Sequence, residues 1–468
     1  MMNKKLAAKR MIMLLLNLIG LILETAVYAY LWFNSFYPRI NNSNTGLKFF
    51  VNGHILIIMI YFILLYFFTS TYGGLKVGYL KPMDVMLSQV VSAILVNVIT
   101  YFQLSLMNNW LLPVRRFLLL FVVQAAIIIL WTLLCNVIYH RVYPPRQILL
   151  VHGDRPYEDI VRKFNSRSDK FNIARTINVS EGIEKICKII EDEYKTVLLW
   201  DLDTYKRNRL LKFCYSKSIR VYMMPKIPDV LVKGSDPVHL FDTPLLLIGE
   251  HALTVEQRAT KRVFDIICSI ILIVITSPVM LITAIAIKLY DGGPVLYKQV
   301  RCTAGAKEFK ILKFRSMKVD AEKDGVARLA SKSDSRITPI GRFIRSVRID
   351  ELPQLFNIFI GDMSFIGPRP ERPEIIEQYA QKMPEFVFRM KMKAGLAGYA
   401  QVYGKYNTTP YDKLKLDLTY IENYSVWLDL KLMLLTLKIL LKPESTEGIE
   451  NTQTTAMKDP SGEKETDE

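Results

Sequence analysis

Hydrophobic residues gather in five long runs of this chain. Four of the runs precede residue 140 and cover residues 11–33, 49–70, 85–107 and 117–139. A helix needs about 20 consecutive apolar residues to cross the hydrocarbon core of a bilayer. Each run therefore predicts a membrane-spanning helix, and residues 1–145 are expected to form a four-helix transmembrane bundle. The fifth run, residues 263–289, stands apart from the others.

The charges that flank the first four runs predict an orientation. Basic residues lie before the first run, between the second and third, and after the fourth: Lys4, Lys5, Lys9, Arg10, Lys76, Lys81, Arg141 and Arg146. By the positive-inside rule, both ends of the bundle are expected in the cytoplasm. Arg115 and Arg116 lie in the nominally outer third loop and disagree mildly with this orientation. Glu24, inside the first run, is either a functional carboxyl or a polar contact between helices.

The pattern changes after Pro144 and Pro145. Short apolar stretches that predict strands, at residues 147–151, 171–177, 196–200 and 221–224, alternate with helical stretches near 157–164, 183–193 and 205–216. This alternation predicts a parallel, Rossmann-like α/β domain, which we assign to residues 146–249. A dinucleotide site would need the pattern Gly-x-Gly-x-x-Gly after the first strand. Only Gly153 occurs there, so no dinucleotide cofactor is expected.

Residues 250–445 mix basic, Gly/Pro-containing and amphipathic segments, which predicts an α-rich domain. Thr338 and Pro339 are typical of the start of a helix. Arginines 342, 345 and 348 come next at intervals of three residues, opposite apolar positions. Such a helix lies either on a membrane face or on the domain's own core. Residues 427–442 are apolar but too short and too charged to span, and are also expected at the membrane interface.

Two further segments carry weaker signals. Residues 395–398 (Gly-Leu-Ala-Gly) predict a turn beneath the site rather than a phosphate-binding loop. Residues 446–468 are polar and rich in Glu, Thr and Lys, which predicts a disordered tail.

Composition narrows the range of partners. The formal net charge is +17 and 51% of the residues are hydrophobic. A basic chain can bind nucleic acid, anionic lipid or phosphorylated substrates. Here the cations flank apolar runs, which favours a membrane surface, and no nucleic-acid-binding motif is visible. The five cysteines show no CxxC spacing, which is typical of a reducing cytosol rather than of a disulfide framework or zinc site.

The candidate chemistry centres on Asp350 and Glu351. They come after the arginine-bearing helix and precede a Gly/Pro-rich turn, residues 361–370, that contains Arg369. Carboxylates can hold Mg²⁺ or attack phosphorus, and arginines bind phosphate oxygens through two parallel hydrogen bonds. Together they suggest phosphoryl transfer with a magnesium ion. The Asp-Glu pair alone carries no signal in a chain with 22% charged residues.

The surroundings of this pair resemble a known family. Seven blocks occur in order, at residues 261–265, 277–278, 292–301, 309–317, 350–357, 361–370 and 395–401. They are similar to the catalytic domain of the bacterial monotopic phosphoglycosyl transferases, also called bacterial sugar transferases. The resemblance covers roughly residues 256–442. With the four upstream runs, it points to the large membrane-embedded branch that starts capsule and exopolysaccharide repeat units.

The resemblance implies a reaction and a place in the cell. A phosphosugar would pass from a UDP-sugar, with glucose or galactose the usual choice, to undecaprenyl phosphate with release of UMP. The chain would be a multi-pass phosphotransferase of the bacterial inner membrane, with its catalytic domain on the cytoplasmic face. The fifth run would be a re-entrant helix, 263–289, bent at Ser277 and Pro278, where Ser277 can satisfy a carbonyl that the proline frees. Acetamido sugars remain open, as does a homo-oligomer.

The resemblance also implies roles for individual residues. Asp350 would be the nucleophile that forms a phosphosugar–aspartyl intermediate, and Glu351 would hold Mg²⁺. Phosphate and nucleotide contacts would come from Lys313, Arg315, Arg345 and Arg369. Asp362 and Gln354 would support the site or serve the fold.

Two other classes of function are compatible with parts of the chain. A transporter would need paired charges within several spans and inverted repeats, whereas only Glu24 and Asp84 approach that pattern. A membrane-anchored regulator could bind a ligand through the middle domain, but it would not account for the ordered blocks after residue 256.

Overall fold

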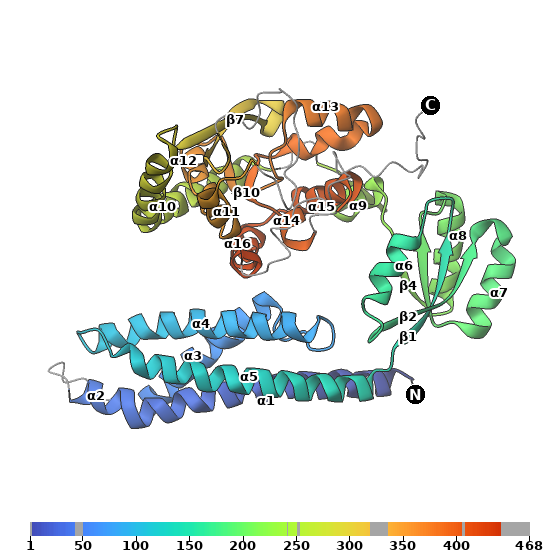
Figure 1. The fold of residues 1–468 in the computed structure, drawn as a ribbon. Coiled ribbons are helices and arrows are strands. Elements are labelled where there is room, and N and C mark those ends of the chain that lie inside the picture. The colour runs from blue at the N-terminus through green and yellow to red at the C-terminus, as the bar shows by residue number, and fades with distance from the viewer. Residues whose placement is uncertain are drawn as a thin grey trace. The chain divides into compact units, whose positions relative to one another are not determined.

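The structure is a computed structural model that describes residues 2–42, 50–240, 242–249, 253–318, 336–404 and 408–440. The chain divides into two compact units, Met1–Met224 and Pro225–Glu468, whose elements are drawn in Figure 1. The predicted disordered tail, residues 446–468, lies outside the described residues. The chain carries several helices that are long and apolar enough to cross a membrane, as its composition predicted.

Four long helices form the first part of the first unit. They are α1 (Met2–Leu31), α3 (Val51–Tyr72), α4 (Pro82–Met107) and α5 (Val114–Val142). A π-helical turn, η1 (Trp32–Phe36), joins α1 to the short α2 (Tyr37–Asn41). The four predicted apolar runs are therefore confirmed as helices, each with ends that differ by a few residues.

Polar side chains link these helices inside the bundle. Tyr61 Oη donates to Asn97 Oδ1 (2.8 Å), Asn97 Nδ2 donates to Gln124 Oε1 (2.9 Å), and Gln124 Nε2 donates to Tyr61 Oη (2.7 Å). Each partner satisfies the next where water would be absent. Glu24 is only 3% exposed, and its Oε2 has no hydrogen-bond partner among the described residues. This polar link between helices thus comes from amides and a phenol rather than from the buried carboxyl.

The rest of the first unit is an α/β fold. Strands β1 (Arg146–His152), β2 (Phe171–Asn178), β3 (Thr196–Trp200) and β4 (Arg220–Met223) form a parallel sheet in the order β2-β1-β3-β4. Helices α6 (Glu158–Asn165), α7 (Ile183–Glu193) and α8 (Thr204–Ser216) alternate with the strands. Ile148 and Leu150 pack with residues of α6, whereas Leu149 and Val151 pack with residues of α7 and α8. The two faces of the sheet are therefore both covered, which accounts for the apolar central strands β1 and β3.

The loop between α3 and α4 contacts this α/β fold. Arg167 donates to the main-chain oxygen of Tyr79 (3.0 Å), and Lys170 lies 3.7 Å from the centre of the Tyr79 ring. The nearby Gly78 has φ +71°, and a Cβ there would lie 2.3 Å from ring atoms of Tyr139. Glycine thus lets the loop approach α5 closely. The α3–α4 loop thus contacts both α5 and the α/β fold.

The second unit begins earlier than the predicted boundary at residue 249. Helix α9 (Ile227–Lys233) buries Ile227 and Val230 in the core of this unit. Gly234 packs so closely on α15 (Pro410–Glu422) that a Cβ would lie 2.3 Å from Glu422 Cβ. By packing, residues 225–249 belong to the second unit rather than to the α/β fold.

Helix α10 (Val255–Asp291) opens the region that resembles the transferases. After it come the antiparallel pair β7 (Leu296–Cys302) and β8 (Glu308–Phe314), then α11 (Pro339–Ser346), η4 (Ile349–Glu351), α12 (Gln354–Ile360), β9 (Ser364–Ile366), α13 (Pro373–Lys382), η5 (Pro384–Lys391), β10 (Gly395–Ala397), α14 (Tyr399–Tyr403), α15 and α16 (Val426–Leu440). A second hairpin, β5 (Asp236–Leu240) and β6 (Thr243–Leu247), precedes α10.

Buried polar contacts attach the first part of α10 to the second unit. Lys261 Nζ lies 2.5 Å from Asp429 Oδ2, and Tyr420 Oη donates to the other oxygen of Asp429 at 2.7 Å. One turn further along, Asp265 Oδ1 accepts hydrogen bonds from the hydroxyl of Ser364 and the main chain of β9, both at 3.0 Å. The start of α10 is therefore built into the unit rather than projecting from it.

The later part of α10 packs on the same unit. Ile287 is buried with Phe314 and Ile344. Pro278 lies inside the helix without ending it. Ser277 Oγ donates to the main-chain oxygen of Val274 at 2.8 Å, the carbonyl that loses its usual partner because Pro278 has no N–H. This contact confirms the predicted compensation by Ser277.

Two local predictions differ from the structure. Helix α11 ends at Ser346, and Arg348 lies beyond it in a left-handed conformation (φ 56°), so the arginine repeat is not one continuous helix. In α16, two of the charges that excluded a membrane span, Asp429 and Lys438, are buried inside the unit, and the second difference is in β10. Residues 395–397 form strand β10 rather than a turn, and a Cβ at Gly395 would lie 2.1 Å from Gly367 N. The glycine there serves close strand approach.

We predict that Lys261→Met destabilises the second unit by about 3–5 kcal/mol, because it leaves the carboxylate of Asp429 buried without its cation. Burial already raises the pKa of Asp429. Unfolding of the detergent-solubilised full chain measures the loss. The double variant Lys261→Met/Asp429→Leu should regain most of the stability. A double variant no more stable than Lys261→Met alone would show that the ion pair is not the cause.

Candidate active site

Asp350 and Glu351 lie on η4, a single turn between α11 and α12. Thr338 begins α11 by accepting a hydrogen bond from Gly341 N at 2.9 Å, as the sequence predicted. Arg348, in its left-handed conformation, then lies between the end of α11 and η4. The turn presents two adjacent carboxyl groups beside the β7–β8 hairpin.

Three cations surround Glu351. Its Oε1 lies 3.2 Å from Lys313 Nζ on β8 and 3.4 Å from Arg369 Nη2, and its Oε2 lies 3.5 Å from Arg348 Nη1. Burial disfavours the charged form of this carboxyl. The charges of Lys313, Arg369 and Arg348 outweigh burial and hold the pKa of Glu351 well below its ordinary value. Glu351 is therefore an anion at any physiological pH.

Asp350 has the opposite electrostatic environment. Burial, and then the negative charge of Glu351, raise the pKa of Asp350 to about 6. The charges of Lys313, Arg345 and Arg348 only partly offset these effects. Two neighbouring carboxyl groups with pKa values moved apart are typical of sites in which each has a separate role. Asp350 is the more basic of the two, and thus the better nucleophile or proton acceptor.

Arg369 comes from a rigid turn after β9. Gly367 N donates to the main-chain oxygen of Ala397, and Gly395 N donates to that of Pro368, both at 2.9 Å. A Cβ at Gly367 would lie 2.2 Å from the main-chain oxygen of Lys393, so only glycine allows this approach. Prolines on both sides of Arg369 restrict its backbone further.

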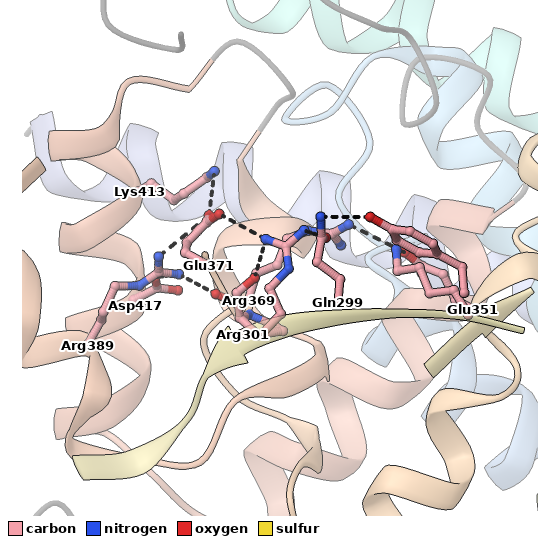
Figure 2. A network of polar contacts seen from close by, with 11 residues as sticks. Gln299, Arg301, Glu351, Arg369, Glu371, Arg389, Lys413 and Asp417 are labelled. Carbon is pink, nitrogen blue, oxygen red and sulfur yellow. Dashed lines mark hydrogen bonds and ion pairs between the residues drawn. The ribbon is translucent and has the colours of Figure 1, made fainter. Parts of the chain in front are cut away.

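A network of polar contacts continues from Arg369 away from the carboxyl pair (Figure 2). Glu371 lies within 3.6–3.8 Å of Arg301, Arg389 and Lys413. Although burial disfavours its charge, these cations lower the pKa of Glu371. Arg301 also donates to Gln299 Oε1 (2.6 Å). The cationic side chains of the whole cluster thus outnumber its carboxylates, which suits an anionic substrate.

The other predicted site residues lie in different surroundings. Arg345 is near enough to Asp350 for its charge to lower the carboxyl pKa. Arg315 instead pairs with Asp291 at the end of α10, and a Cβ at Gly293 would contact its guanidinium. Asp362 Oδ2 accepts a hydrogen bond from Asn357 at 3.3 Å. Asn357 also donates to the main-chain oxygen of Lys310 and so joins α12 to β8. Gln354 is buried in the first turn of α12.

Several members of the network were not predicted. Gln299 and Arg301 share one face of β7 with Tyr297, and this alternation is a readable signal within the block at residues 292–301. Glu371 lies directly after the Gly-Pro-Arg-Pro turn. Arg389 and Asp417 have no such signal, because they lie in ordinary amphipathic segments, η5 and α15, that only the fold brings together.

A magnesium ion fits the donor chemistry of the carboxyl pair. Mg²⁺ is commonly held by one or two carboxylates together with substrate phosphates. Asp350 and Glu351 provide such a pair. Among the described residues there is no group of three His, Cys, Asp or Glu side chains that would enclose a metal without substrate. Glu351 would hold the ion more readily, because it stays ionised.

Known proteins resemble the part of the chain that contains this site. Residues 256–443 match the bacterial sugar transferase family. A "UDP-N-acetylgalactosamine-undecaprenyl-phosphate N-acetylgalactosaminephosphotransferase" of Aeromonas hydrophila is 38% identical over 236 residues, which cover 50% of this chain and 55% of that protein. The match thus spans only about half the length of this relative.

Two shorter relatives are matched over most of their length. A "UDP-glucose:undecaprenyl-phosphate glucose-1-phosphate transferase" of Caulobacter vibrioides is 38% identical over 228 residues, 47% of this chain and 85% of that protein. A "Putative undecaprenyl-phosphate N-acetylgalactosaminyl 1-phosphate transferase" of Bacillus subtilis is 48% identical over 145 residues, 30% of this chain and 80% of that protein. Because the match covers most of both proteins, the chain belongs to the bacterial sugar transferase family.

Proposed function

We propose that this chain transfers a phosphosugar from a UDP-sugar to undecaprenyl phosphate and releases UMP. The observation that carries the proposal is the carboxyl pair on η4 within a cluster of cations, with Lys313, Arg348 and Arg369 around Glu351. Those cations hold the pKa of Glu351 below its ordinary value, whereas burial raises the pKa of Asp350 to about 6. The names of the relatives support the same reaction class. Those names differ in the sugar (glucose or N-acetylgalactosamine), so the sugar stays open.

The reaction can be written as two displacements at one phosphorus atom. In the first, a carboxylate oxygen of Asp350 attacks the β-phosphorus of the UDP-sugar, the bond to the bridging oxygen breaks, and UMP leaves with the electron pair. In the second, a phosphate oxygen of undecaprenyl phosphate attacks the same phosphorus and releases Asp350. One phosphoanhydride bond is exchanged for another, and no oxidant or further reactant is needed.

The surrounding cations serve this route. Lys313 and Arg369 bind Glu351, at 3.2 and 3.4 Å, and both can extend toward phosphate oxygens in the same space. Burial lowers the pKa of Lys313, but the neighbouring carboxylates favour its ammonium form. The charges of Arg345 and Arg348 also act on Asp350. Glu351 would hold Mg²⁺, which when bound would screen the negative charges of nucleophile and diphosphate from each other.

The contacts of α10 support a membrane arrangement. Both its first part, through Lys261 and Asp265, and its last part, through Ile287, pack on the second unit. The side chains between them are largely exposed and apolar, including Ile271 and Ile275. We therefore propose that α10 enters and leaves the bilayer on the cytoplasmic face. Residues 1–145 would form the four-helix transmembrane bundle of a multi-pass inner-membrane protein, and the middle domain would be a Rossmann-like support.

The re-entrant arrangement predicts that both flanks of α10 label from the same side. Thr260 and Lys298 are exposed positions at the two flanks of its apolar stretch. Single cysteines there, in a chain whose native cysteines are replaced by alanine, should react equally with a membrane-impermeant maleimide in inverted vesicles and poorly in intact cells. Labelling of the two positions from opposite sides would mean that α10 crosses the membrane.

Asp350→Asn should abolish the covalent adduct and lower UMP release by about 10³-fold or more, while UDP-sugar binding changes little. Intact mass measurement after mixing the enzyme with a UDP-sugar alone tests this. The wild type should gain the mass of a sugar phosphate, located on the peptide that contains Asp350. Glu377→Gln, on the exposed face of α13, is the control. UMP that appears only when lipid is present, without an adduct, would favour direct attack by the lipid phosphate.

The pKa of Asp350 predicts the pH dependence. Because the carboxylate is the reacting form, kcat/KM for adduct formation should fall about tenfold per pH unit below pH 6 and level off above it. Glu351→Gln removes a negative neighbour that raises this pKa, so its residual activity should show the acid limb at lower pH. Rapid-quench measurements between about pH 4.5 and pH 8 test both. An acid limb that moves to higher pH in Glu351→Gln would contradict the assignment.

A further inference from the structure

Arg389 is a buried cation outside the carboxyl pair. It lies on η5, is 3% exposed, and its Nη2 lies 2.8 Å from Oδ2 of Asp417 on α15, which is 1% exposed. Burial raises the pKa of Asp417, which shows how unfavourable this environment is for charge. Removing two charges from water is costly unless their contacts are good. The other contacts of Arg389 therefore indicate what role this buried pair has.

The same guanidinium contacts the turn that carries Arg369. Its Nη2 donates to the main-chain oxygen of Arg369 at 2.9 Å, and its Nη1 lies 3.6 Å from Oε1 of Glu371. The ring of Phe386 lies 5.0 Å from the guanidinium carbon and limits its movement. Figure 2 shows Arg389 and Asp417 on the side of this turn that is remote from Glu351. One cation thus holds two positions of the segment 369–371.

This contact matters because the direction of the Arg369 side chain depends on its backbone. The side chain is 38% exposed, and it pairs with Glu351 at a distance of 3.4 Å. Gly395 N holds the carbonyl before Arg369, that of Pro368, and Arg389 holds the carbonyl of Arg369 itself. The two hydrogen bonds fix the peptide groups on both sides of the arginine.

We infer that Arg389, neutralised by Asp417, is a positioning residue for phosphosugar transfer that acts through Arg369. The inference rests on the proposed function and adds to it a residue that touches neither substrate nor the carboxyl pair. Lysine at this position would keep a positive charge beside Asp417. It would lose the planar guanidinium that reaches both Asp417 and the Arg369 carbonyl.

A double-mutant cycle tests the inference. Arg389→Lys should lower kcat/KM for UMP release about tenfold or more in the otherwise wild-type chain, the size expected for a lost hydrogen bond from a charged donor. In the Arg369→Ala background the same change should cost less than about twofold, because the group that Arg389 positions is gone. Asp417→Asn should behave in the same way. Lys391→Gln, an exposed cation of the same element, is the matched control and should lose nothing in either background.

The possible outcomes separate the claims. Arg389→Lys retains a cation for Asp417, so folding should persist, and the thermal unfolding midpoint of each solubilised variant checks this. Equal losses from Arg389→Lys in both backgrounds would show a general structural role and overturn the inference, while the proposed function stands. A wild-type chain that releases no UMP from any UDP-sugar in the presence of undecaprenyl phosphate would overturn the proposed function, and this inference with it.

Discussion

Two carboxyl groups on adjacent residues cannot both be ionised in a buried site unless cations compensate one of them. Around η4, the cations compensate Glu351 more fully than Asp350. Lys313, Arg348 and Arg369 all lie within 3.5 Å of Glu351, and Asp350 is left with the higher pKa. The difference between the two residues arises from their neighbours and not from their own chemistry. Everything proposed for the site depends on those three cations being where they are.

Each of the three cations is placed by a different element. Lys313 comes from β8 and Arg369 from the turn after β9, while Arg348 follows α11 and itself adopts a left-handed conformation. Glycines at 367 and 395 allow the backbone around Arg369 to pack closely. The three cations are therefore far apart in the sequence but are held together by the fold. A site that stabilises charge without rearranging needs such fixed positions.

Most of the fold and the centre of the site were predictable from local patterns, whereas side-chain partners were not. Long apolar runs identified the helices of the bundle, the periodicity of residues 146–224 located strands β1–β4 to within a residue or two, and contiguous motifs located Asp350, Glu351 and Arg369. The motif predicted phosphate contacts for both Lys313 and Arg315. In the structure, Lys313 contacts Glu351, whereas Arg315 pairs with Asp291 at the end of α10. Arg389 and Asp417 meet only because η5 packs on α15. Such partners are set by tertiary packing, which no local pattern records.

Helix α9 has a consequence for how such chains can be assembled and divided. Ile227 and Val230 fill the core of the second unit, each contributing about 1.5–3 kcal/mol of apolar burial. By packing, the second unit therefore starts near residue 225, before the β5–β6 hairpin. A fragment that starts at residue 250, the boundary predicted from the sequence, would lack α9. It would expose an apolar face on α15 and would be expected to aggregate. Any junction that joins the second unit to a different N-terminal part must therefore preserve α9 to keep this core closed.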